Sequence, residues 1–151
     1  MQRVIVSDTS CLILLSKLGK LTILKSLFGT ITVTSAIAIE FNESLPDFIR
    51  IEDPADKKHL TILETFLDKG EASAIALAIE NDDCLLIIDE LKGRKEAQKI
   101  GLNYTGTLGI IILAKEKGLI SSISEFIEQI SQTNFRVSDA LIKELKRKVN
   151  E

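Results

Sequence analysis

The stretch Cys84-Leu85-Leu86-Ile87-Ile88-Asp89 decides the fold class. It is a continuous apolar run without polar alternation, which is typical of a strand that is covered on both faces within a parallel sheet. Helical patterns flank the run, and a carboxylate ends it. The stretch therefore predicts an α/β domain in which Asp89 lies at the carboxyl end of a central strand.

The sequence on either side of this run repeats the alternation of strand and helix. Further short strands are predicted at Val4–Ser7, Ile31–Val33 and 102–105, separated by segments with apolar residues at helical spacing. We therefore expect a three-layer α/β/α domain over residues 1–120 with a mostly parallel central sheet, and a helical C-terminal extension over 121–151 packed on the same domain.

The longer connections are marked by proline and glycine. Both prolines fall in 45–54, which is predicted to be a loop. Gly70 is predicted to stop a helix over 56–68, with a new alanine-rich helix over 71–80. Two helices, over 122–131 and 138–149, are expected to complete the chain.

Size and charge narrow the class of protein. The 151 residues, 45% of them hydrophobic, suffice for one core. The net charge of −3, from 19 basic and 22 acidic residues, argues against a module that holds nucleic acid by overall positive charge. It remains compatible with a nuclease that gathers carboxylates around a metal ion.

The cysteines and the hydropathy pattern bear on the compartment. Cys11 and Cys84 lie in apolar runs without metal-ligand spacing, as expected of core residues in a reducing environment. No apolar stretch reaches the 18 or more residues of a spanning helix. We therefore expect a cytoplasmic protein with no membrane contact.

Several acidic side chains are predicted to meet at one edge of the sheet. Ligands of open parallel sheets bind outside the carboxyl ends of the strands, where Asp8 and Asp89 are placed. The expected lengths of the 71–80 helix and the following strand bring Glu71 to the same edge. Glu40 is a charge in an apolar helical stretch that starts at this edge, and such a charge calls for a partner or a metal.

Carboxylates gathered in this way favour a hard cation, Mg²⁺ or Mn²⁺. Each acid also has a simpler interpretation: Asp8 could cap the helix that begins at Thr9 and Ser10, and Glu71 and Glu90 could be first-turn acids. A phosphoryl-transfer or receiver-like domain would also use Asp8 and Asp89, but it needs a strand-end lysine that we do not find.

Four segments together resemble a PIN domain, most closely the prokaryotic PIN-like proteins related to VapC toxins. They are Val4-Ile-Val-Ser-Asp8-Thr9-Ser10, Glu40 after the second strand, Gly70-Glu71-Ala-Ser-Ala-Ile-Ala-Leu-Ala, and Leu85-Leu-Ile-Ile-Asp89-Glu90 with the later Gly106-Thr107-Leu-Gly. The resemblance implies a metal-dependent ribonuclease fold in which Asp8, Glu40, Glu71 and Asp89 are catalytic and hold Mg²⁺ or Mn²⁺.

The same resemblance implies supporting residues and partners. Thr9 or Ser10 supplies a small hydroxyl beside Asp8, and Glu90 is a further supporting acid. RNA is the implied substrate, with a homodimer and an antitoxin protein as implied partners. The helix predicted to start just beyond Asp89 carries three cations that are candidates for binding substrate phosphates, or that form a solvated helix face: Lys92, Arg94 and Lys95. The alternative function is a catalytically degenerate PIN-like module that binds RNA or a regulatory partner.

Overall fold

The computed structural model describes residues 3–133, 143 and 147. Five strands form one sheet in the order β3-β2-β1-β4-β5, and every paired strand is parallel to its neighbour. Their bounds are β1 Val4–Ser7, β2 Ile31–Val33, β3 Ile49–Ile51, β4 Cys84–Ile87 and β5 Asn103–Thr105. The predicted parallel α/β sheet is confirmed.

The apolar run that decided the fold class lies beside β1 at the centre of the sheet. β1 and β4 pair residue by residue from Val4 with Cys84 to Ser7 with Ile87. The chain lays β2 and β3 on one side of β1 and then returns to place β4 on the other side. The carboxyl ends of β1 and β4 therefore form the switch point at which such sheets bind ligands.

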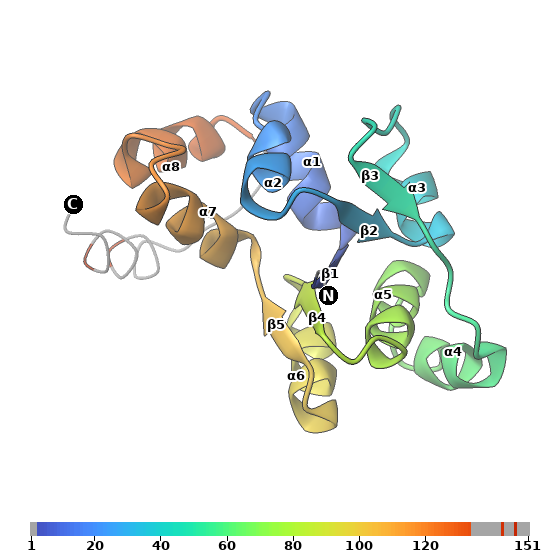
Figure 1. Ribbon diagram of the computed structural model, residues 1–151. Helices are drawn as coiled ribbons and strands as arrows, with labels where there is room; N and C mark the ends of the chain where they lie inside the picture. Colours follow the sequence, from blue (N-terminus) through green and yellow to red (C-terminus); the bar gives the residue numbers. More distant parts are fainter. Residues whose placement is uncertain (1–2, 134–142, 144–146, 148–151) are drawn as a thin grey trace.

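Helices cover the sheet on both faces (Figure 1). In the figure α4, α5 and α6 lie on one side of the strands and α1, α2 and α7 on the other. Their bounds are α1 Thr9–Lys17, α2 Thr22–Phe28, α3 Ser35–Phe41, α4 Lys57–Glu64, α5 Lys69–Ile79, α6 Leu91–Ile100, α7 Thr107–Glu116 and α8 Ile123–Ser131. The predicted three-layer arrangement is observed, with α8 as the described part of the C-terminal helices.

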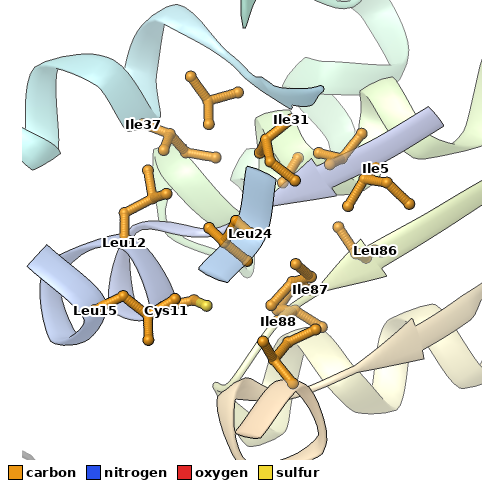
Figure 2. Packing of buried hydrophobic residues seen from close by; sticks show 14 of the residues in the cluster. Ile5, Cys11, Leu12, Leu15, Leu24, Ile31, Ile37, Leu86, Ile87 and Ile88 are labelled. Atoms are coloured by element: carbon orange, nitrogen blue, oxygen red, sulfur yellow. The ribbon is translucent and has the colours of Figure 1, made fainter. Parts of the chain in front are cut away.

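The core is continuous across the central strands and α1. Figure 2 shows buried side chains of α1, α2, β2 and β4 gathered in this core, among them Leu12, Leu24, Ile31 and Ile87. Cys11 is fully buried among them, and Cys84 is also buried and free. Both cysteines are thus core residues, as predicted.

Two predictions about the connections are wrong. The segment 45–54 is not entirely a loop, because Ile49–Ile51 forms edge strand β3 against β2. The two prolines of this segment indicated a loop and masked the short strand. Gly70 does not stop a helix, since α4 already ends at Glu64 and Gly70 lies in the first turn of α5.

The helix predicted over 138–149 falls almost wholly outside the described residues. Among the described helices, none is long and apolar enough to span a bilayer.

Candidate metal centre

A small hollow opens at the switch point of the sheet, with a volume of about 80 Å³. Five acidic side chains line it, together with two hydroxyls and one glycine: Asp8, Thr9, Ser10, Glu40, Asp68, Gly70, Glu71 and Glu90. The lining contains no basic side chain. Of the site residues predicted from sequence, Asp8, Thr9, Ser10, Glu40, Glu71 and Glu90 are therefore brought together.

Asp8 is held in place by backbone N–H groups. It is the N-cap of α1, where the Cys11 N–H donates to Oδ1 at 3.1 Å, and the Asp89 N–H donates to Oδ2 at 2.8 Å. The residue is 5% exposed. Burial raises the pKa of Asp8 to about 7, and the charge of Asp89 adds to the rise, while both N–H donors oppose it.

Asp89 follows β4 but does not line the hollow. The backbone N–H of Thr107 donates to its Oδ1 at 2.8 Å, and the Thr107 hydroxyl donates to its Oδ2 at 2.5 Å. Asp89 therefore ties the start of α7 to the end of β4. A side chain at Gly106, the N-cap of α7, would approach Asp89 Oδ1 to 2.9 Å, so this corner is closely packed. We use the name strand-end wall for Asp8, which lines the hollow, together with Asp89, whose backbone N–H donates to it.

Glu71 lines the hollow from the first turn of α5 and is only 8% exposed. Its Oε2 is buried and has no hydrogen-bond partner among the described residues. The pKa of Glu71 is raised to about 8, and burial is the largest cause. The hydrogen bond of its side chain with Asp68 and the charges of Asp68, Glu90 and Asp8 raise the pKa further. A buried carboxyl without a cationic neighbour keeps its proton at neutral pH.

Two glycines make room for the glutamates. A Cβ on Gly70 would collide with Glu40 Oε1, and a Cβ on Gly93 of α6 would lie 2.7 Å from Glu71 Oε2. Glu40 itself is exposed, and its pKa is raised by partial burial and by the charge of Asp68. The carboxyl group of Glu40 thus lies against α5 at Gly70, and that of Glu71 lies against α6 at Gly93.

Asp68 is a site residue that the sequence analysis missed. It is the N-cap of α5, and its Oδ1 accepts from the Glu71 N–H at 2.8 Å. The signal was present, because Asp68-Lys-Gly-Glu71 has the spacing of a helix-capping pair. The prediction of a helix ending at Gly70 hid it. We call Glu40, Asp68 and Glu71 the helix wall.

The three predicted phosphate-binding cations lie on α6, just after Glu90. Lys92, Arg94 and Lys95 are all exposed, and none of them lines the hollow. Arg94 stacks over the ring of Tyr104 in β5, 5.5 Å from its centroid. The structure therefore leaves these side chains accessible on the helix that follows the acidic hollow.

The donor set fits a hard divalent cation. Carboxylate and hydroxyl oxygens dominate the lining, and a buried carboxylate oxygen without a partner has the chemistry that such an ion satisfies. Within the described residues no three His, Cys, Asp or Glu side chains are already gathered closely enough to hold an ion. Holding one would therefore require the carboxyl groups to lose protons and turn toward each other.

The structural class is thus a five-stranded parallel α/β fold with an acid-lined hollow at its switch point. A PIN-domain model matches residues 4–151, in agreement with this architecture. The chain belongs to the PIN domain family. The search of curated proteins returned no match to it.

Proposed function

We propose that the chain is a divalent-metal-dependent endoribonuclease that hydrolyses RNA phosphodiesters and acts as the toxin of a toxin–antitoxin pair. One observation carries the proposal: Asp8 and Glu71, two buried carboxyl groups with strongly raised pKa values, line the same hollow of a PIN-domain fold. Raised carboxyl pKa values in a cleft are typical of functional sites.

Asp8 and Glu71 would hold Mg²⁺ or Mn²⁺ in their ionised forms, with Glu40 at the rim. Such an ion supplies an acidified water and positive charge for the phosphate. Asp89 supports the arrangement because its N–H holds Asp8 Oδ2, while its own carboxylate is bound by Thr107. No nucleophilic side chain is required for this hydrolysis.

The remaining residues of the site serve the substrate. The hydroxyls of Thr9 and Ser10 line the hollow and can donate to a phosphate oxygen or a water, and Glu90 adds negative charge at the rim. The accessible cations of α6 can bind the phosphates of a single strand laid across the rim: Lys92, Arg94 and Lys95.

Glu71→Gln provides the cleanest test of the proposal. Glutamine has the shape of the protonated glutamic acid and can still hydrogen-bond Asp68, but it cannot provide a carboxylate. With Mn²⁺ present, we expect Glu71→Gln to reduce cleavage of a mixed pool of structured and single-stranded RNA at least about a hundred-fold. Glu64→Gln, an exposed change at the end of α4, should cleave like the wild type. EDTA should abolish the wild-type activity, and Mn²⁺ should restore it.

A second function is favoured by one observation, the absence of a ready-made three-acid group among the described residues. This function is that of a PIN-fold module that binds RNA or a regulatory partner without cleavage. Pure wild-type protein, freed of any antitoxin, that binds RNA but leaves the whole pool uncut with Mn²⁺ would establish the module and overturn the nuclease.

The family resemblance also leads us to propose a homodimer and an antitoxin protein as partners. Light scattering of the purified chain tests the first. Copurification with the product of an adjacent gene tests the second.

A further inference from the structure

Asp68 both caps a helix and lines the acidic hollow. As the N-cap of α5 it uses Oδ1 to accept the Glu71 N–H, and it is also part of the lining of the hollow. The protein contains a useful comparison in Asp56, which caps α4 in the same way by accepting the His59 N–H at 3.0 Å. Asp56 does not line the hollow. Asp56 and Asp68 thus cap their helices in the same way, and they differ in that Asp68 lines the hollow.

Asp68 lies close enough to three other acids of the hollow for its charge to act on them. Its negative charge contributes to the raised pKa of Glu40, Glu71 and Asp8, and its side chain is hydrogen-bonded to that of Glu71. Glu40 reaches the same helix end because Gly70 lacks a side chain. Carboxyl groups from α3 and α5 thus converge on one turn of helix.

When its carboxyl groups are ionised, this convergence is electrostatically unfavourable unless a cation joins it. Like charges at short range repel, and the lining supplies no basic side chain. The buried Glu71 Oε2, which has no hydrogen-bond partner in the described part of the chain, is an independent sign that the described side chains do not complete the site. A divalent ion would satisfy both conditions.

We propose that Asp68 is a further ligand of the divalent cation, beside Glu71 and Glu40 on the helix wall. The inference rests on the proposed metal-dependent function and extends it by one residue. Asp89 and Asp68 differ in how their carboxylate oxygens are bound. Both oxygens of Asp89 accept from Thr107, whereas Asp68 Oδ2 accepts no backbone N–H of its own helix among the hydrogen bonds of the described residues.

Asp68→Ser separates ligation from capping, because serine caps helices as well as aspartate does but has no carboxylate. Asp56→Ser is the matched control. In calorimetric titration with Mn²⁺ alone at about 0.15 M salt, we expect Asp68→Ser to raise the dissociation constant at least about ten-fold, and Asp56→Ser to leave it unchanged. Both variants should show similar small shifts in melting temperature.

Repeating the titration at about 1 M salt distinguishes a ligand from a charge that acts through space. Salt screens a distant charge, so the loss would shrink if Asp68 only contributed to the local potential. We expect the ten-fold loss to persist.

The possible failures are distinguishable. Wild-type affinity in Asp68→Ser, or a loss that vanishes at high salt, would overturn the inference while Glu71→Gln still tests the nuclease. No Mn²⁺ binding by the wild type would overturn both.

Discussion

The strand-end wall and the helix wall differ in how their carboxyl groups are satisfied. On the strand-end wall, both oxygens of Asp8 accept backbone N–H groups, and both oxygens of Asp89 are bound by Thr107. On the helix wall, Glu71 Oε2 is buried without a partner among the described residues, and Glu40 rests against Gly70.

This difference shows that acidic residues close to one another at the same site can have different effects on stability. Removing a carboxylate that caps backbone donors leaves buried N–H groups unsatisfied, which costs free energy. Replacing the buried, protonated Glu71 by a neutral side chain of the same shape removes neither a charge nor a partner of the backbone, so it costs little free energy. The strand-end wall therefore supports the fold, whereas the carboxyl group of Glu71 on the helix wall adds little to it, as expected of a residue retained for function.

The largest expected contrast between the walls is in unfolding free energy. Asp8→Ala removes a helix cap and the acceptor of the Asp89 N–H, so we expect a loss of about 2–4 kcal/mol. Glu71→Gln should stay within about 0.5 kcal/mol of the wild type or exceed it, because it mimics the protonated acid. Urea unfolding of the metal-free proteins measures both, and equal losses in the two variants would erase the distinction between the walls.

The two glycines should also respond differently. Gly93→Ala would press a methyl group against buried Glu71 Oε2 and against Ile88 Cδ1, which would lie 2.5 Å away, so we expect a loss of about 1–3 kcal/mol from overpacking. Gly70→Ala meets only the end of exposed Glu40, which can swing outward; it should be neutral or gain up to about 1 kcal/mol from helix propensity.

Thermal unfolding together with Mn²⁺ titration checks the glycine pair. Gly70→Ala should keep its melting temperature and bind Mn²⁺ more weakly, since Glu40 is displaced. A Gly70→Ala protein that is as destabilised as Gly93→Ala would mean that Glu40 is fixed rather than free to move.

The metal-free protein should lose stability as the pH rises from about 4 to about 8. Asp8 and Glu71 have folded-state pKa values of about 7 and 8, above the ordinary values of 3.8 and 4.5. Between these limits the native state binds more protons than the unfolded state, so the unfolding free energy falls with increasing pH. Glu71→Gln should flatten the dependence, and a wild-type protein whose stability rises over this range would contradict the burial of both acids.

The smallest effect is expected on α6. Arg94→Ala loses its stacking on Tyr104, at a cost below about 1 kcal/mol, and one contact to RNA. In the Glu71→Gln background, the slope of log affinity for single-stranded RNA against log salt should decrease by about 0.7, as for one phosphate. Lys99→Ala, an exposed change at the far end of α6, is the control; an equal decrease there would indicate a diffuse charge effect.

Much of the strand-end wall could be predicted from sequence, because apolar strands that end in an acid specify both an element and its edge. Asp8 and Asp89 are examples. The contact between Asp89 and Thr107 could not be predicted, since it depends on how α7 starts against β4.

The helix wall was predicted less completely. Glu71 was assigned to the correct edge from element lengths. The start of α5 was placed two residues too late, because glycine usually ends helices rather than lying in their first turn. At Gly70 the carboxyl group of Glu40 occupies the space that a side chain would take. That contact comes from α3, thirty residues earlier, and leaves no local signal.

The most direct test of the account is calorimetric titration of the wild type with Mn²⁺ at pH 7 in two buffers that differ in ionisation enthalpy. The pKa values of about 7 for Asp8 and about 8 for Glu71 leave both groups at least about half protonated in the metal-free protein at this pH. If the ion is held by these two carboxylates, binding must release protons, and the observed heat must change with the buffer. We predict binding with proton release, and less release with weaker binding in Glu71→Gln. Absence of binding, or binding whose heat is independent of the buffer and unchanged in Glu71→Gln, would contradict the account.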